Sequence, residues 1–440
     1  MSSYYDGLNE KLLAAIPPVS RVLELGCANG RLGYRYKQLN AGAYWTGVDI
    51  SADAVQQAAK RLDEAYLLDL DDCRLDTLHD DYDAIVIGDL LEHTKNPQKL
   101  LMALRARCKD TAVLVCCVPN MAHISVIERL LSGDLTYDQE GLLDDTHLRF
   151  FTPRSIIKNF LDTGWLPRLV DHYDVGSRNV NLRQQLVNAA QSIGVPERTA
   201  ISNLFMYQLV FRCSLLQNIE KPSTFPKLSV VIPTTDENQL ALNILRSPGL
   251  NEINAEIVPV KDAPDPYSAL EFGVTKASGD WFIFCHQDVY FPRGSGYRLC
   301  QHLGSIPAAR HADTLIGFAG LAIDPNGNPI QSGLVVDRTS LFDGPVGHNV
   351  ISIDELAIVV SKGTHHRIDP TLGWHLWATD LCLKAIQEKR NRGIEIVRIP
   401  VFHNSYNDFQ LSEAFHASAS ILKRKYPAHS SIKTLCGEIV

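Results

Sequence analysis

The stretch Arg21-Val-Leu-Glu-Leu-Gly-Cys-Ala-Asn-Gly30 decides the fold of the first half of this chain. Its apolar residues predict a buried strand that runs past an acidic residue into a turn with glycines at both ends. Glycine permits tight dihedrals and close approach of a bulky ligand, and the helix that follows offers unpaired N–H groups. Asp49 closes the next apolar stretch, Tyr44-Trp-Thr-Gly-Val-Asp49, where a carboxylate can accept both hydroxyls of a ribose. Together these features predict a nucleotide-type site, although Gly26-x-x-x-Gly30 lacks the final glycine of the dinucleotide fingerprint.

Short apolar strands alternate with helical patterns from Arg21 to about Cys213, which predicts a doubly wound α/β sheet. Asn96 before Pro97 and Thr152 before Pro153 are typical of helix starts. Gly164 is expected to end the second of these helices. The strand candidates are Val22–Leu25, Tyr44–Val48, Ala65–Leu68, Ala84–Ile87 and Ala112–Val118.

A chain of 440 residues with 45% hydrophobic content should divide into two domains of roughly 200 residues each. The polar segment 216–227 carries two prolines between two strand-like runs, Leu204–Phe211 and Leu228–Ile232, and is the expected linker. The domains would then span 1–215 and 228–440. A second α/β alternation follows the linker, with strands expected at Leu228–Ile232, Glu256–Val260 and Trp281–Cys285 and helices at Gln239–Leu245 and Tyr267–Ala277.

The charge and cysteine content exclude some classes of protein. A net charge of −8 and a pI near 6.0 argue against a nucleic-acid partner, because such binding relies on a basic surface. The ten cysteines form no C-x-x-C pair and no zinc spacing with histidine, which indicates reduced thiols, mostly buried. The start, Met1–Asp6, shows no basic region followed by an apolar core, and no apolar stretch approaches the roughly 18 residues of a membrane span. We therefore expect a cytoplasmic protein without a transmembrane segment, and peripheral membrane contact stays open.

The ordered set Glu24, Gly26, Ala28, Gly30 and Asp49 resembles the class I S-adenosylmethionine-dependent methyltransferases over roughly residues 20 to 172. Ala28 departs from the glycine that many members have there. The resemblance implies a Rossmann-like methyltransferase sheet with S-adenosylmethionine as cofactor. It places Glu24, Gly26 and Gly30 around the amino-acid portion of the donor and Asp49 at the ribose. The alternative is that these residues are only strand ends and turns of an α/β fold.

Two further parts of the donor pocket follow from the same resemblance. Asp69 or Asp71 would meet the adenine amine. The segment Tyr82-Asp-Ala-Ile-Val-Ile-Gly-Asp-Leu-Leu-Glu-His93 is similar to the family's fourth strand and the loop under the methionine part, which makes Asp89 a candidate contact.

Methyl transfer is an in-line displacement from a sulfonium, so the enzyme positions the reactants and supplies a base where the nucleophile is a hydroxyl. The segment 141–151 lies in the acceptor-side region of the family's fold. In it Asp144, His147 and Arg149 alternate with apolar residues, which favours a shaped polar loop. His147 is the candidate base, and the alternative is that it only hydrogen-bonds a loop carbonyl and organises the pocket. His93 is expected to organise a loop.

The stretch Leu228-Ser-Val-Val-Ile-Pro-Thr234, followed by Val258-Pro-Val-Lys-Asp262 and the run 269–289, resembles the family 2-like glycosyltransferases of GT-A fold. In that family an acidic motif at a strand end holds a divalent metal against the diphosphate of a sugar nucleotide. A hard cation with oxygen ligands neutralises the leaving phosphates. The motif here is His286-Gln-Asp288, with histidine in place of the usual first aspartate. Asp288 and His286 are the candidate ligands, Mn²⁺ or Mg²⁺ the candidate ion, and a histidine ligand favours manganese.

The resemblance also implies roles for residues outside the metal motif. Pro233, Thr234 and Asp262 would bind the nucleotide. His403, in the run Phe402-His-Asn-Ser-Tyr406, would complete the metal shell, and the alternative is that it packs beside Tyr406 without a metal.

An inverting transfer needs a carboxylate that takes the acceptor's proton. Asp380, in the helical pattern 374–385, is the candidate, and the competing interpretation is a carboxylate favoured only by the helix dipole. Asp354 and Glu355 either line the acceptor side or form a solvated loop.

The leading functional prediction is a bifunctional transferase that uses S-adenosylmethionine and a nucleotide sugar during assembly of a surface polysaccharide or other glycan. The methyl acceptor would be a sugar hydroxyl or a sugar substituent. An alternative keeps the methyltransferase and makes the second domain a glycan-binding or docking module without turnover, as His286 and the short span between Thr234 and Asp262 suggest. A weaker one assigns both pockets to regulation or scaffolding.

Overall fold

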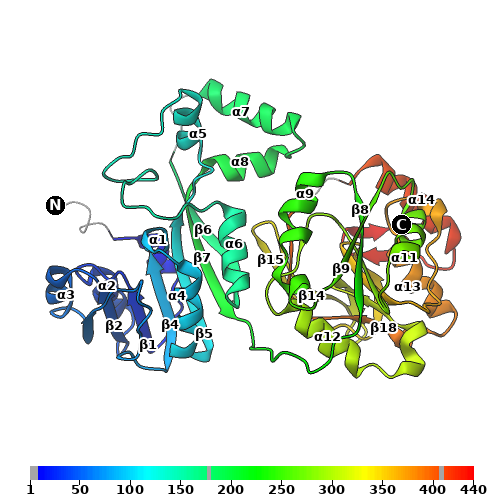
Figure 1. The fold of residues 1–440 in the computed structure, drawn as a ribbon, viewed down its shortest axis with the longest axis horizontal. Helices are drawn as coiled ribbons and strands as arrows, with labels where there is room; N and C mark the ends of the chain where they lie inside the picture. Colours follow the sequence, from blue (N-terminus) through cyan, green and yellow to red (C-terminus); the bar gives the residue numbers. More distant parts are fainter. Residues whose placement is uncertain (1–7, 176–179, 406–410) are drawn as a thin grey trace. The chain divides into compact units, whose positions relative to one another are not determined.

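The computed structural model describes residues 8–175, 180–405 and 411–440. The chain divides into a first unit, Met1–Asn218, and a second unit, Ile219–Val440, each with its own core (Figure 1). The division falls inside the segment 216–227. The start of the chain and Tyr406, which both entered the predictions above, lie outside the described residues.

The first unit is built on a seven-stranded sheet with the order β3-β2-β1-β4-β5-β7-β6. The first five strands pair in parallel, whereas β7 is antiparallel to both β5 and β6. The strands are β1 (Arg21–Leu25), β2 (Tyr44–Asp49), β3 (Glu64–Leu67), β4 (Tyr82–Gly88), β5 (Cys108–Pro119), β6 (Trp165–Asp174) and β7 (Met206–Leu215). The helices are α1 (Glu10–Ala15), α2 (Arg31–Leu39), α3 (Ala52–Ala58), η2 (Leu91–His93), α4 (Pro97–Leu104), η3 (Arg105–Arg107), α5 (Ile124–Leu131), α6 (Pro153–Asp162), α7 (Val180–Ser192) and α8 (Glu197–Phe205).

The central strands form where the sequence predicted them because they are nearly continuous apolar runs, as parallel strands covered on both faces require. The helix starts also follow the predicted capping residues. The Asn96 side chain accepts a hydrogen bond from the Lys99 N–H at 2.9 Å. Thr152 and Ser155 form a capping box at the start of α6, and Gly164 after its end has a φ of 81°.

The prediction of a strand over Leu204–Phe211 is wrong at its start. Leu204 and Phe205 belong to α8, and β7 begins at Met206. Both side chains are buried in a small core with Ile124 of α5 and Val187 of α7. These three helices lie together, away from the sheet (Figure 1). Packing in this helical cap therefore overrides the apolar run in the sequence.

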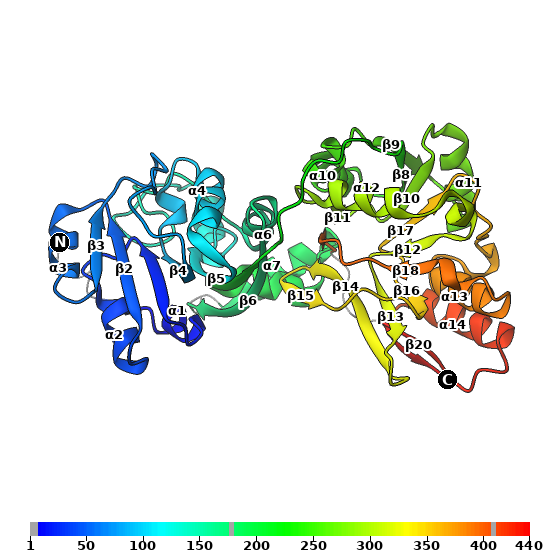
Figure 2. The same cartoon turned by 90° about the horizontal axis from the view of Figure 1, so that it is seen from below.

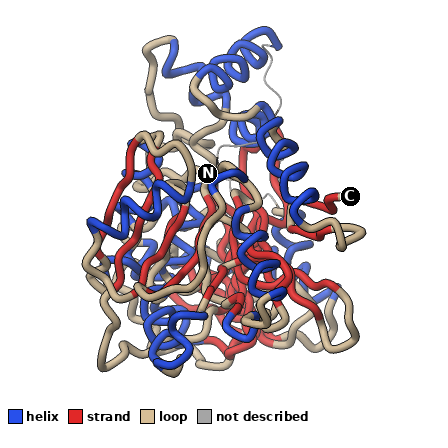
Figure 3. The backbone as a smooth tube through the Cα atoms, turned by 90° about the vertical axis from the view of Figure 1, so that its right-hand side faces the viewer, coloured by secondary structure: helices blue, strands red, loops and turns tan. Residues whose placement is uncertain are grey.

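The second unit contains a six-stranded sheet of order β18-β12-β17-β10-β8-β9, a second sheet of order β11-β19-β14-β13-β16 with β15 paired to β14, and a β20–β21 hairpin beside the C-terminus (Figure 2). Helices and strands both occur through the described chain (Figure 3). The strands are β8 (Leu228–Thr234), β9 (Glu256–Lys261), β10 (Trp281–Cys285), β11 (Val289–Tyr290), β12 (Leu315–Gly317), β13 (Ala319–Ile323), β14 (Pro329–Asp337), β15 (Ser340–Asp343), β16 (Val350–Ile353), β17 (Ala357–Ser361), β18 (Ile394–Ile396), β19 (Val401–His403), β20 (Ile432–Thr434) and β21 (Gly437–Ile439). The helices are α9 (Glu237–Leu242), η4 (Ile244–Arg246), α10 (Pro248–Asn251), α11 (Pro266–Lys276), α12 (Ser295–Ser305), η5 (Ala308–Asp313), η6 (Pro370–Leu372), α13 (Trp377–Gln387), η7 (Asn391–Gly393) and α14 (Glu413–Lys425).

The strand β10 shows how the first of these sheets is covered. Phe282 and Phe284 pack into one apolar core, whereas Trp281, Ile283 and Cys285 pack into another on the opposite face. This alternation follows from the two-residue repeat of a strand. Its bounds match the predicted strand.

Among the described residues, the helices are all too short or too polar to cross a membrane.

Candidate functional site

The turn after β1 presents backbone to the carboxyl edge of the first sheet. Gly26, Ala28 and Gly30 have φ values of 73°, 47° and 77°, all in the left-handed region. The N–H groups of Gly26 and Cys27 donate to the Val48 carbonyl at 2.8 and 3.0 Å, which ties the turn to β2. Gly30 is also the N-cap of α2 and brings no side chain there. The turn is therefore packed closely against the protein, since a Cβ at Gly30 would lie 3.0 Å from Ala58 and Leu62, and it lies beside a helix N-terminus, where polar ligands are favoured.

Asp49 bridges the ends of β1 and β2. Its Oδ2 accepts from the Ala28 N–H and its Oδ1 from the Ser51 N–H, both at 2.9 Å. The residue is 8% exposed. Each carboxylate oxygen keeps a further lone pair, so Asp49 can hold the turn and still accept hydroxyls.

Glu24 lies beneath the turn. It is 6% exposed and accepts a hydrogen bond from Trp45 Nε1 at 2.9 Å. Burial raises the pKa of Glu24 to about 8. A Cβ added at the neighbouring Gly33 would lie 2.4 Å from Trp45 Nε1, so this packing is tight. Glu24 thus ties β1 to Trp45 of β2.

The structure distinguishes the two aspartates after β3. Asp71 accepts from the Lys95 backbone N–H at 2.7 Å and pairs with the Lys95 ammonium at 3.4 Å. Asp69 is exposed, and its side chain accepts the local N–H of Asp71 at 2.9 Å. Asp69 is therefore the better placed of the two for a ligand.

Asp89 follows β4 with a φ of 48°. Its Oδ1 accepts from Gln208 Nε2 on β7 at 2.7 Å, and burial raises the pKa of Asp89 to about 6. Gln208 was not predicted, because it comes from the far end of the unit's sequence.

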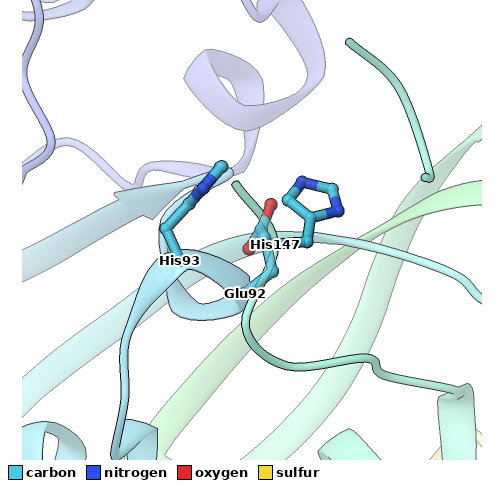
Figure 4. Close-up of side chains that lie close together, drawn as sticks. All are labelled: Glu92, His93 and His147. Carbon is cyan, nitrogen blue, oxygen red and sulfur yellow. The ribbon is translucent and has the colours of Figure 1, made fainter. Parts of the chain in front are cut away.

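Glu92, His93 and His147 converge beyond β4 (Figure 4). The backbone carbonyl of Glu92 accepts from the N–H groups of Leu148 and Arg149 at 2.7 and 2.9 Å, which fixes the loop that carries His147 beside η2. The two imidazole rings meet edge to face with centroids 4.7 Å apart. Glu92 was not among the predicted residues, although it stands next to His93.

His147 makes the loop contact that the sequence analysis gave as the alternative to a base. Its Nδ1 lies 3.2 Å from the Leu142 carbonyl, so the ring does organise the loop. Burial and the nearby His93 lower the pKa of His147, so the ring is neutral near pH 7 and retains a basic nitrogen.

The second unit gathers His286, Asp288 and His403 at the end of β10. One possible ligand atom from each lies within 4.8 Å of the others. His403 Nε2 is 3.6 Å from Asp288 Oδ1, and its Nδ1 is 3.0 Å from Asp337 Oδ1. These two carboxylates raise the pKa of His403 to about 10, and the histidines hold the pKa of Asp288 well below its usual range. Asp337, on β14, was not predicted.

One oxygen of the predicted metal ligands is in the state that a bound cation would satisfy. Within the described part of the chain, Asp288 Oδ1 is buried without a hydrogen-bond partner. A divalent ion would satisfy that oxygen, but His403 would first have to lose its proton.

The nucleotide candidates lie along the carboxyl edge of β8, β9 and β10, which pair in parallel. Pro233 and buried Thr234 end β8, and exposed Asp262 follows β9 with a φ of 55°. Gln287 Oε1 accepts from the N–H groups of Thr235 and Asp236, both at 2.9 Å. Gln287, which was not predicted, thereby joins the turn after β8 to the metal motif.

The prediction of Asp380 as a base does not fit its position. Asp380 is fully buried and pairs with Lys384 and Lys425 at 3.0 and 2.7 Å. The Tyr426 hydroxyl donates to it at 2.7 Å. This face of α13 packs against the end of α14, so the carboxylate is a structural ion-pair partner and meets no acceptor.

Glu355 carries a carboxyl group at the sheet edge where His286 and Asp288 lie. It is half-buried and accepts from the Ala378 N–H at the start of α13 at 3.2 Å. It lies just before β17, whose Ala357 pairs with Cys285 next to His286. Burial, with a smaller contribution from Asp354, raises the pKa of Glu355 to about 8. A carboxyl group therefore lies at the same edge as the His286–Asp288–His403 cluster.

Comparison with known proteins identifies the first unit. Residues 23–114 match a family model described as a methyltransferase domain, so the chain carries an N-terminal methyltransferase domain. Similar solved structures include an S-adenosylmethionine-dependent methyltransferase from Archaeoglobus fulgidus, with 16% identity and a TM-score of 0.34 over 48% of this chain and 96% of that chain. An S-adenosylmethionine-dependent methyltransferase from Mesorhizobium loti has 16% identity and a TM-score of 0.32 over 48% of this chain and 99% of that chain. An O-methyltransferase from a Brevibacillus brevis trans-AT PKS multienzyme, in complex with S-adenosyl-L-homocysteine, has 13% identity and a TM-score of 0.31 over 47% of this chain and 71% of that chain. No curated protein matches the chain.

Proposed function

We propose that the first unit transfers a methyl group from S-adenosylmethionine, with the donor across the carboxyl edge of β1 and β2. The observation that carries this proposal is the left-handed turn from Gly26 to Gly30, which the carboxylate of Asp49 holds through the Ala28 N–H. Asp49 receives the ribose hydroxyls, Asp69 the adenine amine, and the turn from Gly26 to Gly30 the amino-acid portion. Asp89 lies beside the methionine part. Glu24, held by Trp45, borders the amino-acid portion from beneath.

The methyl acceptor in this proposal is a hydroxyl of a sugar or of a sugar substituent. Positioning the oxygen in line with the sulfonium supplies much of the rate, and a neutral imidazole can take the proton. His147 is that base. Its hydrogen bond to the Leu142 carbonyl holds the ring in one orientation.

For the second unit we propose a metal-dependent inverting glycosyltransferase that uses a nucleotide sugar. A divalent cation at Asp288 and His286, with His403 as a third ligand, would neutralise the leaving diphosphate. Pro233, Thr234 and Asp262 would line the nucleotide. Glu355 replaces Asp380 as the proposed base.

A second candidate function for this unit is glycan binding or docking without turnover. It is favoured by the two carboxylates around His403, since a protonated imidazole already supplies positive charge between Asp288 and Asp337. In either version both units would act during assembly of a surface polysaccharide or related glycan.

Calorimetric titration of the full chain with S-adenosylhomocysteine tests the methyl-donor proposal. We expect binding with one equivalent, and absence of binding would contradict it. Release of nucleoside diphosphate from sugar nucleotides with Mn²⁺, abolished by Asp288→Ala, would support the glycosyltransferase. Retained glycan binding without any release would favour the docking module.

A further inference from the structure

We propose that Glu92, His93 and His147 form a binding site for a divalent transition-metal ion, zinc in the first instance, beside the methyl donor. The role of this ion rests on the proposed methyltransferase function, whereas its binding does not.

The three side chains supply the ligands of a known class of metal site. One possible ligand atom from each lies within 4.8 Å of the other two (Figure 4). Ligand atoms around a zinc ion, each about 2 Å from the metal, lie somewhat closer together, so a small closure of the side chains completes the site. Two imidazoles with one carboxylate leave a position open for a reacting group, as catalytic zinc sites do.

The side chain of Glu92 is an independent observation in favour of a bound cation. It is 1% exposed, and within the described residues its Oε2 is buried without a hydrogen-bond partner. A buried carboxylate oxygen in that state is unfavourable unless a cation or donor meets it. A metal ion held between this oxygen and the imidazoles of His93 and His147 would supply that partner.

The two imidazoles are held in the way that metal ligands require. His93 Nδ1 lies 3.0 Å from Thr146 Oγ1 and His147 Nδ1 lies 3.2 Å from the Leu142 carbonyl. Thr146 Oγ1 in turn donates to the buried carboxylate of Asp144 at 2.5 Å. An Nδ1–H that donates to such partners leaves Nε2 of the same neutral ring with its lone pair for a metal.

The open position suggests what the ion does in methyl transfer. A hydroxyl bound to a divalent ion loses its proton more readily, as water does on zinc. The proton passes to solvent, the resulting oxyanion forms a bond to the methyl carbon, and the carbon–sulfur bond breaks with its electron pair on sulfur. S-adenosylhomocysteine and a methyl ether result. In this arrangement His147 is a ligand and no longer takes the proton itself.

The test is zinc titration of the metal-free full chain. Asp288→Asn is the background, because it disables the separate cluster in the second unit. We expect one equivalent of zinc to bind by calorimetry, and Co²⁺ to give the visible absorption of a low-coordinate site. Glu92→Gln and His147→Ala should each weaken zinc binding on the order of 100-fold, while His79→Ala, which removes an exposed histidine of the same unit, should not.

A thermal-shift measurement distinguishes a variant that lacks a metal-binding side chain from a variant that no longer folds. Zinc should raise the melting temperature of the background protein and not that of Glu92→Gln, which should remain folded because glutamine keeps the shape of the side chain. Equal zinc affinity in Glu92→Gln, His147→Ala and His79→Ala would overturn the site, as would failure to bind one equivalent.

Binding of S-adenosylhomocysteine by the metal-free protein is measured in parallel. Its loss together with retained zinc binding would overturn the methyl-donor proposal alone. Retained binding without zinc binding would overturn the metal site alone.

Discussion

The two units place an aspartate at the same kind of sheet edge and compensate its charge in opposite ways. Asp49 in the first unit is met by backbone N–H groups, which are dipoles. Asp288 in the second unit faces His403, an imidazole that two carboxylates keep protonated. Dipoles leave the negative charge of Asp49 available to ligand hydroxyls, whereas a formal positive charge already balances Asp288. The first edge is therefore ready for a neutral polar ligand, and the second must exchange a proton for a metal.

The largest effect expected from a single substitution comes from Asp380 in the second unit. Asp380→Ala removes one of the two carboxylates that Lys425 meets and the acceptor of the Tyr426 hydroxyl, and it should lower the free energy of unfolding by about 3 kcal/mol or more. Scanning calorimetry of the full chain measures this loss. Asp380→Asn, which can still accept from Tyr426, should lose less. A stable Asp380→Asn protein without sugar transfer would restore Asp380 as the base.

Asp49→Ala should come next, and it tests the first half of the comparison. It removes the acceptor of ligand hydroxyls and leaves the Ala28 and Ser51 N–H groups unsatisfied. Affinity for S-adenosylhomocysteine should fall about 100-fold by calorimetry. Asp288→Ala should leave that affinity unchanged. Equal losses in the two variants would show that the edges are not independent.

A smaller effect with a defined pH dependence is expected at Glu24. Its pKa is raised from 4.5 to about 8, so the folded state holds more protons than the unfolded state between these pH values. Stability of the native chain should therefore fall as pH rises through this window. Glu24→Gln has no charge to bury. Between pH 5 and 8 its free energy of unfolding should exceed that of the native chain by about 1 kcal/mol, a net value that allows for the loss of one acceptor oxygen. Urea unfolding of both proteins at several pH values measures this. A difference in the free energy of unfolding that does not change with pH would contradict it.

The smallest effect should follow from Gln287→Ala, which frees the turn after β8 from the metal motif. The two lost hydrogen bonds at Thr235 and Asp236 are partly replaced by water. Affinity for a nucleotide sugar should fall about fivefold by titration, with S-adenosylhomocysteine binding as the internal control. An unchanged affinity would place the nucleotide away from this turn.

The sequence predicted the parallel strands of the first sheet, because strands such as β1 and β4 are continuous apolar runs with turn residues at their ends, but it did not predict β6. It did not predict the second sheet of the second unit. The strand β11 has two residues and β19 three, and such short pieces carry too little pattern to be distinguished from loops.

The same limit applies to the candidate sites. Asp49 and His147 could be named because a strand end or a polar loop marks them locally. Gln208 and Asp337 could not, because only tertiary contacts bring them to Asp89 and His403. The burial of Asp380 likewise depends on α14, a helix that begins more than thirty positions further along the chain.

The helical cap of α5, α7 and α8 has a consequence for how such a protein can diversify. Among the described residues, its core around Ile124, Val187 and Leu204 shares no residue with the core that contains Val22 of β1, while α5 also packs through Val126 against Leu142, near His147. Mutations in the cap can thus reshape the neighbourhood of the acceptor loop without disturbing the part that holds the donor. Chimaeras that exchange these helices would be a practical route to altered substrate range at constant cofactor use.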